Sequence, residues 1–155
     1  MTEHKDHADV KIHPPILALL HILAAFVLHR IFPLYLPFAY ILLVIGGLFA
    51  LLGLMLAFAA VRELAKARTT IDPHGSVSTV VMSGPYQFTR NPIYLGFVCI
   101  LIGFPMIFGT WWGIVLVTVF ILLMNSLVIQ YEEAYLEKKF GDVYTNYKSR
   151  VRRWL

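Results

Sequence analysis

The chain contains a long interval without a charged side chain, bounded by Arg90 and Glu132. Positions 91–131 hold no aspartate, glutamate, lysine or arginine, and nearly all of them are apolar. A helix that crosses a bilayer needs about 20 apolar residues. The interval is therefore long enough to cross a membrane and return, which would bring the polar groups at its two borders to the same membrane face.

The composition agrees with a membrane protein of one domain. Of its 155 residues, 59% are hydrophobic and 14% are charged, whereas a soluble domain carries about 25% charged residues. The formal net charge is +4. The positive residues are distributed as membrane orientation requires, so we expect no nucleic-acid partner. Cys99 is the only cysteine, which excludes an intramolecular disulfide.

Four apolar segments have the length and composition of membrane helices, and they predict an all-α, polytopic membrane protein. Gly141 is a natural stop for the charged helix that follows the last span, and Tyr144 and Tyr147 then recur at helical spacing among basic residues. We expect this C-terminal helix to be amphipathic and cytoplasmic, either lying on the membrane surface or folding back over the protein. The predicted spans are residues 16–32, 38–61, 93–108 and 111–130.

Lysine and arginine residues predict the orientation of these spans. If four helices alternate, every one of the 13 lysines and arginines except Arg30 falls on one side. That side is then the cytoplasm and holds both termini, which gives a multi-pass protein of the cytoplasmic membrane. We interpret the chain, residues 1–155, as a single membrane domain with a polar tail (1–15), two spans (16–61) and a second half that carries the chemistry (62–155).

The second predicted span has a stripe of small residues, Gly46, Ala50, Gly53 and Ala57. Small residues at this spacing allow a neighbouring helix to approach closely, so the stripe predicts helix packing. His21 and His29 share one helix face, but no further ligands are arranged near them, and no metal site is predicted.

The two borders of the uncharged interval carry polar residues suited to a binding site. Pro92 is placed to begin a helix, whose free N–H groups could bind an anion or a carboxylate. Glu132 and Glu133 are adjacent on the last span, and their side chains point about 100° apart. One carboxylate can therefore face a site, where it could hold a cation or act as a general base, while the other faces water.

Taken in order, these motifs resemble the integral-membrane methyltransferase family, which includes isoprenylcysteine carboxyl methyltransferases and phospholipid methyltransferases. The resemblance covers about residues 62–155, and its motifs are Gly84-Pro85-Tyr86, Arg90-Asn91-Pro92-Ile93-Tyr94, Glu132-Glu133, Phe140-Gly141 and Tyr144-Thr145-Asn146-Tyr147.

The resemblance implies a methyl donor, S-adenosylmethionine, bound without a Rossmann domain, and the sequence has no G-x-G-x-x-G motif after a strand. It implies a lipophilic small molecule or a lipid as substrate, reaching the site from the bilayer. It makes Glu132, Glu133 and Arg90 the catalytic candidates. The cofactor-binding candidates that it implies are Ser78, Thr79, Val80, Val81, Tyr86, Asn91, Pro92, Ile93, Tyr94 and Glu132.

Two positions depart from the family pattern. Asn91 stands where the family usually has histidine; asparagine does not titrate, so this position is not predicted to be a general base. Val128 stands where prenylcysteine methyltransferases have an arginine that is thought to bind the substrate carboxylate, and a carboxylate buried there would lack its partner. We therefore expect an amine, thiol or hydroxyl acceptor, with Glu132 or Glu133 as the base candidate.

The sequence leaves two alternative functions open. One is an NADPH-dependent membrane reductase of sterol or enone type, which carries a similar C-terminal pocket. The other is a non-catalytic membrane relative. Binding of the cofactor distinguishes the three hypotheses.

Overall fold

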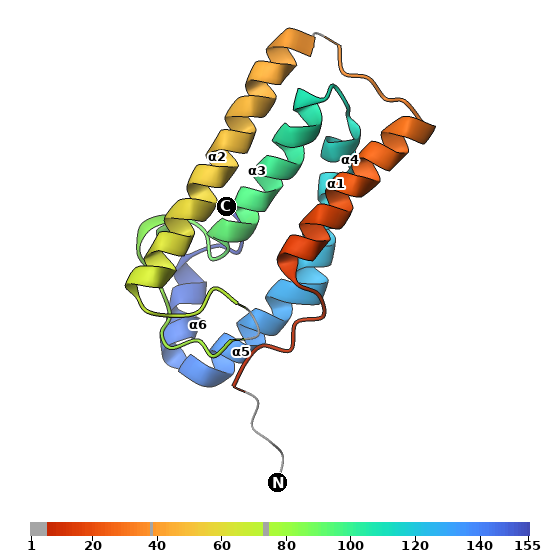
Figure 1. The fold of residues 1–155 in the computed structure, drawn as a ribbon. Coiled ribbons are helices and arrows are strands. Elements are labelled where there is room, and N and C mark those ends of the chain that lie inside the picture. Colours follow the sequence, from red (N-terminus) through yellow and green to blue (C-terminus); the bar gives the residue numbers. More distant parts are fainter. Residues whose placement is uncertain (1–5, 38, 73–74) are drawn as a thin grey trace.

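The computed structural model describes residues 6–37, 39–72 and 75–155. Every regular element in that part of the chain is helical, which confirms the all-α prediction (Figure 1). Tyr35 and Thr110 form an isolated antiparallel bridge between the segment that follows α1 and the turn that precedes α4. The elements are α1 (Pro14–Ile31), α2 (Ala39–Lys66), η1 (Gly84–Gln87), α3 (Pro92–Ile107), α4 (Trp112–Met124), the π-helix η2 (Asn125–Ile129), α5 (Gln130–Phe140) and α6 (Asp142–Arg150).

The predicted spans correspond to helices of unequal length. Among the described residues, three helical segments are long and apolar enough to cross a membrane: α1, α2 from Tyr40 onward, and the continuous run Trp112–Phe140. The fourth, α3, is apolar but has only 16 residues, which is about 24 Å at 1.5 Å per residue. A hydrocarbon core is about 30 Å thick, so α3 is shorter than a full span. The predicted segment, 93–108, has the same length as α3 and is displaced by one residue.

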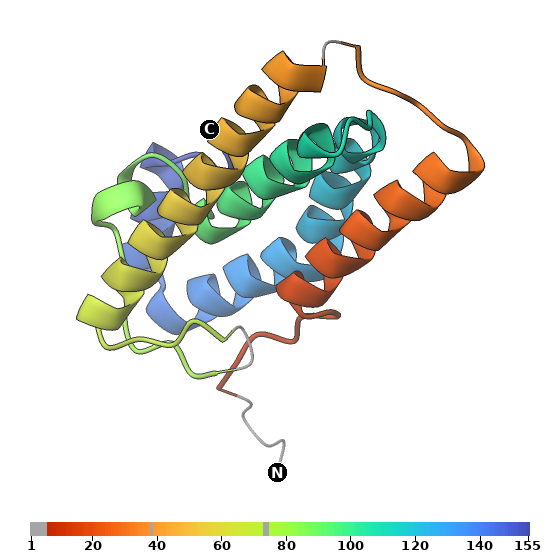
Figure 2. The ribbon, with the colours of Figure 1, turned by 45° about the horizontal axis from the view of Figure 1, so that its top comes forward.

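The α2–α3 pair is the closest helix packing in the molecule, and the small-residue stripe predicted for α2 lies within it (Figure 2). A Cβ built on Gly53 would lie 2.5 Å from the carbonyl oxygen of Gly96, and one built on Gly46 would lie 2.7 Å from that of Gly103. The two backbones therefore approach so closely that only glycine fits at these crossing points. Gly47, one residue away, meets nothing within 4 Å.

A second layer joins α1 to α4 and to α3. Its core contains Leu101, Phe120, Met124, Val128 and Ile129, all with at most 1% of their surface exposed. His21 is buried in this layer, where its Nε2 lies 3.3 Å from the carbonyl oxygen of Gly113. His21 therefore has a packing role, and His29 lies against the ring of Tyr35.

The last helix folds back over the protein. Gly141 adopts a φ of +51°, a conformation that favours glycine, between α5 and α6. Tyr144 and Tyr147 on α6 are buried, and the Tyr147 hydroxyl donates a hydrogen bond to the carbonyl oxygen of Tyr86 at 2.7 Å. Of the two arrangements left open by the sequence, the structure has the one that folds back.

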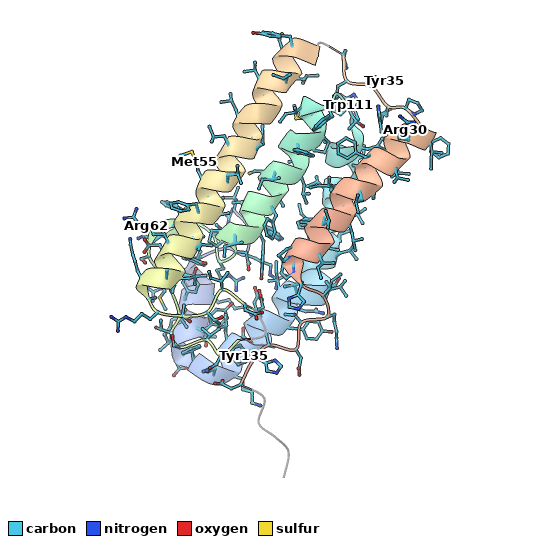
Figure 3. The ribbon with its side chains drawn as sticks, in the orientation of Figure 1. Arg30, Tyr35, Met55, Arg62, Trp111 and Tyr135 are labelled. Atoms are coloured by element: carbon cyan, nitrogen blue, oxygen red, sulfur yellow. The ribbon has the colours of Figure 1, made fainter. Side chains whose placement is uncertain are left out.

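Labelled side chains in Figure 3 mark the two ends of the bundle. Tyr35 and Trp111 lie at the end where α1 passes to α2, and Arg62 and Tyr135 lie toward the opposite end. That opposite end, which we call the pocket end, holds the segment after α2, the start of α3, α5 and α6 (Figure 1).

Candidate functional site

A pocket at the pocket end has a cavity volume of about 150 Å³. Four parts of the chain form its walls: the end of α2 with the segment after it, the start of α3, α5 and α6. Predicted site residues on these walls are Thr79, Val80, Val81, Tyr86, Arg90, Asn91, Pro92, Ile93, Tyr94, Glu132 and Glu133. The structure thus brings together both borders of the uncharged interval.

Ser78 is the one predicted site residue that does not line the pocket. Its backbone N–H donates to Thr69 Oγ1 at 3.0 Å, and its hydroxyl donates to the carbonyl oxygen of Arg68 at 3.0 Å. Ser78 therefore shapes the segment after α2 and does not contact the cavity itself.

Glu132 lines the pocket without a cationic partner among the described residues. Its Oε1 accepts a hydrogen bond from the hydroxyl of Tyr94 at 2.5 Å, and it takes part in none of the ion pairs of the described chain. Glu132 is half-buried, and removing a carboxylate from water without a cationic partner is costly. The site is therefore prepared for an occupant with a positive charge or a proton.

Glu133, in contrast, is surrounded by cations. Arg153 contacts both of its oxygens, with distances of 2.9 Å from Nε and 2.7 Å from the second guanidinium nitrogen. Arg90 lies 3.0 Å and Lys148 3.7 Å from the same carboxylate. The sequence expectation that one of the two carboxylates faces water is therefore wrong, because Glu133 is only 6% exposed and is held in an ion-pair cluster.

Arg90 reaches the pocket wall with part of its guanidinium unused. Its terminal nitrogen pairs with Glu133, but its Nε is buried and has no hydrogen-bond partner. A buried donor without a partner costs free energy. One wall of the pocket therefore contains a buried N–H donor that no described residue satisfies, and the other wall contains Glu132.

Asn91 supports the wall through its amide group. The Asn91 side-chain amide donates to the carbonyl oxygen of Arg153 at 3.0 Å, and the hydroxyl of Thr89 donates to the same oxygen at 3.1 Å. Asn91 thus links the start of α3 to the C-terminal tail, a role that needs a hydrogen-bond donor and no titration.

Three of the tyrosines that line the cavity are Tyr86 on η1 and Tyr144 and Tyr147 on α6. Burial raises the pKa of Tyr144 to about 12, with the Glu133 charge as a further cause. Burial also raises the pKa of Tyr86 and of Tyr147 well above the ordinary value. All three phenols therefore remain neutral O–H groups at physiological pH.

The N-terminal segment forms a further part of the wall that the sequence did not reveal. Ala8 lines the pocket and is buried, and the N–H of Lys11 donates to the carbonyl oxygen of Leu127 in η2 at 2.9 Å. The carboxylate of Asp6 binds Lys139 Nζ at 2.5 Å and also accepts hydrogen bonds from Ser76 and Tyr135. These contacts lower the pKa of Asp6 to about 2, with the Lys139 hydrogen bond as the largest cause.

Val128 lies away from the cavity. It is fully buried in the core beside Phe120 and Met124, and it is not part of the pocket wall. The position at which the related prenylcysteine enzymes place an arginine therefore supplies no charge to this pocket.

Comparison with known proteins gives a family match over most of the chain. Residues 41–143 match the sequence pattern of the phospholipid methyltransferase family. An uncharacterised protein of Haemophilus influenzae is 44% identical over 66 residues, which are 41% of this chain and all of that protein. The protein-S-isoprenylcysteine O-methyltransferase of Schizosaccharomyces pombe is 35% identical over 72 residues, 46% of this chain but only 30% of that enzyme. No solved structure matches.

The family match includes α3, the uncharged interval and both glutamates of the pocket. It agrees with the all-α fold and the multiple apolar helices, which are those of an integral membrane protein. The chain therefore belongs to the phospholipid methyltransferase family, whose members use S-adenosylmethionine.

Proposed function

We propose that the pocket binds S-adenosylmethionine at the cytoplasmic membrane face and that the protein transfers its methyl group to a lipophilic acceptor. One observation carries this proposal: the cavity is lined by Glu132, a carboxylate without a cationic partner among the described residues. The donor molecule has a sulfonium and an ammonium, and both positive charges match this carboxylate. The residues present therefore fit the cofactor that the family uses.

When bound, S-adenosylmethionine supplies an electrophilic methyl group, and the protein contributes alignment and exclusion of water. Tyr94 fixes one oxygen of Glu132 by its hydrogen bond of 2.5 Å. Glu132 then holds positive charge in the cavity and accepts the proton that an ammonium acceptor must lose before its nitrogen attacks. Glu133 is unsuited to that role because both of its oxygens are bound by Arg153.

The charges in the pocket favour an amine, thiol or hydroxyl acceptor over a carboxylate. Arg90, Lys148 and Arg153 all pair with Glu133, and Val128 is buried in the core. Among the described residues that line the cavity, a carboxylate acceptor would meet one cation, Arg90, which is already paired with Glu133, and it would be repelled by Glu132. The apolar part of the wall, suited to a lipid or another lipophilic molecule, consists of Leu64, Ile71, Val77, Val80, Val81, Ile93 and Leu136.

The proposal is tested by methyl transfer in reconstituted vesicles. The purified protein is supplied with S-adenosylmethionine labelled in the methyl group and with either an aminolipid, phosphatidylethanolamine, or a prenylcysteine. We expect label in the aminolipid or another lipophilic amine and none in the prenylcysteine ester. Efficient labelling of the prenylcysteine would contradict the acceptor class, and absence of donor binding would contradict the proposal as a whole.

A further inference from the structure

The C-terminal tail, residues 151–155, lies outside the part of the chain that matches the family, yet it contacts both walls of the pocket. Its backbone pairs with the segment before α3: the N–H of Arg90 donates to the carbonyl oxygen of Arg152 at 3.0 Å. Thr89 and Asn91 donate to the next carbonyl, that of Arg153. Three hydrogen bonds therefore tie the tail to the wall that carries Tyr94.

The side chains of the tail reach the opposite wall. The guanidinium of Arg153 forms a two-pronged ion pair with Glu133 on α5, and this pairing raises the pKa of Arg153. A two-pronged arginine–carboxylate pair fixes geometry as well as charge. The same residue thus binds the α3 wall through its backbone and the α5 wall through its side chain.

Trp154 adds a second attachment on the wall that leads to Glu132. Its indole Nε1 donates to Asn125 Oδ1 at 3.2 Å, and Asn125 is the first residue of the π-helix η2 that ends directly before α5. Single π-helical turns are common at functional sites. In this protein the π-turn receives the C-terminal tail at Asn125 and the N-terminal segment at Leu127.

We propose that Arg153 and Trp154 are positioning residues that set the distance between the two pocket walls and thereby place Glu132 for the cationic donor. Neither side chain lines the cavity, so each acts through a neighbour, Arg153 through Glu133 and Trp154 through Asn125. The contact that they position is the one between Tyr94 and Glu132, which joins the same two walls inside the pocket. This inference rests on the proposed function, because it requires Glu132 to face the donor.

The test compares the affinities of the full-length protein for two ligands that differ in charge at sulfur. S-adenosylmethionine carries a sulfonium, whereas S-adenosylhomocysteine has a neutral thioether. We expect Arg153→Gln to weaken binding of S-adenosylmethionine at least fivefold more than binding of S-adenosylhomocysteine, because a misplaced Glu132 no longer favours the sulfonium. A tail that merely stabilises the fold would weaken both ligands by the same factor, and that result would overturn the inference.

Matched variants make the outcome specific. Arg152→Gln changes the neighbouring arginine, which is exposed and whose side chain reaches only the carbonyl oxygen of Leu155 at 3.5 Å; it should keep the wild-type affinity ratio. Trp154→Phe removes the indole donor and keeps an aromatic ring, and it should shift the ratio in the same direction by a smaller factor. If Arg153→Gln does not fold, the ratio of the two ligand affinities in Trp154→Phe tests the inference instead. If the wild-type protein binds neither ligand, the proposed function fails, which is distinct from failure of the positioning role.

Discussion

In the contact between α2 and α3, which we call the seam, backbone lies against backbone. Gly53 faces Gly96, and Gly46 faces Gly103. At the pocket end, the walls are held apart around a cavity by charged and hydroxyl groups, including the cluster of Arg90, Glu133 and Arg153. The atoms that a Cβ on Gly46 or Gly53 would meet belong to no charged side chain, and the crossing points leave no room for a side chain larger than the hydrogen of glycine. One helix serves both regions, because α3 is packed closely along α2 and presents Tyr94 to the cavity from its first turn.

Of the variants that compare the pocket end with the seam, Glu133→Gln is expected to have the largest effect. This change leaves Arg90, which is only 9% exposed, beside a neutral amide, and breaking a buried ion pair costs about 3–5 kcal/mol. We expect a drop of this size in the free energy of unfolding, measured by denaturant titration in detergent micelles. Glu137→Gln is the control, because the Glu137–Lys148 pair is partly exposed and such pairs contribute at most about 1 kcal/mol. Equal stability of the two variants would contradict the structural role of the cluster.

Glu132→Gln should leave the fold intact and remove most of the activity. The substitution keeps the size of the side chain and its acceptor for the Tyr94 hydroxyl, but it deletes the charge that we assign to the donor and to the proton. We expect turnover to fall about 100-fold, the lower limit for losing a general base, with the melting temperature unchanged or raised. A variant that retains wild-type turnover on every accepted substrate would remove Glu132 from the chemistry.

Gly53→Ala probes the seam and should leave the pocket alone. The added methyl group would lie 2.5 Å from the Gly96 carbonyl oxygen, and overpacking of this kind costs about 1–3 kcal/mol. Gly47→Ala on the same helix meets nothing within 4 Å and should be neutral or stabilising by up to about 1 kcal/mol. Thermal unfolding of the two variants measures the difference, and indistinguishable melting temperatures would show that the seam is looser than described.

Tyr94→Phe is expected to have the smallest effect of the four. It removes the hydrogen bond to Glu132 and keeps the packing of the ring. A hydrogen bond to a charged group contributes about 1.5 kcal/mol, so turnover should fall about tenfold. A loss as large as that of Glu132→Gln would mean that the hydroxyl takes part in the reaction directly, which steady-state rates at saturating donor would reveal.

The helices and the small-residue stripe were predictable because they depend on local composition and spacing. Gly46 and Gly53 indicated a close helix contact, and the structure shows the contact with α3. The bounds of α3 were predictable as well, because the expected range, 93–108, differs from Pro92–Ile107 by one residue at each end.

The walls of the pocket were predictable in outline through the family resemblance, but the different roles of the two glutamates were not. Which carboxylate meets Arg153 depends on where the C-terminal tail returns, some 20 residues later in the chain. The same holds for Ala8 and Tyr135, which reach the pocket region through contacts between distant segments. Periodicity within one helix carries no information on such contacts between distant segments.

The most direct test of the central claim is calorimetry of the wild-type protein and Glu132→Gln in detergent, with S-adenosylhomocysteine, S-adenosylmethionine and NADPH as separate ligands. We predict that the wild-type protein binds both adenosyl ligands, that Glu132→Gln binds S-adenosylmethionine more weakly, and that neither form binds NADPH. Binding of NADPH alone would contradict the account and favour a reductase, whereas binding of none of the three would favour a relative without catalytic activity.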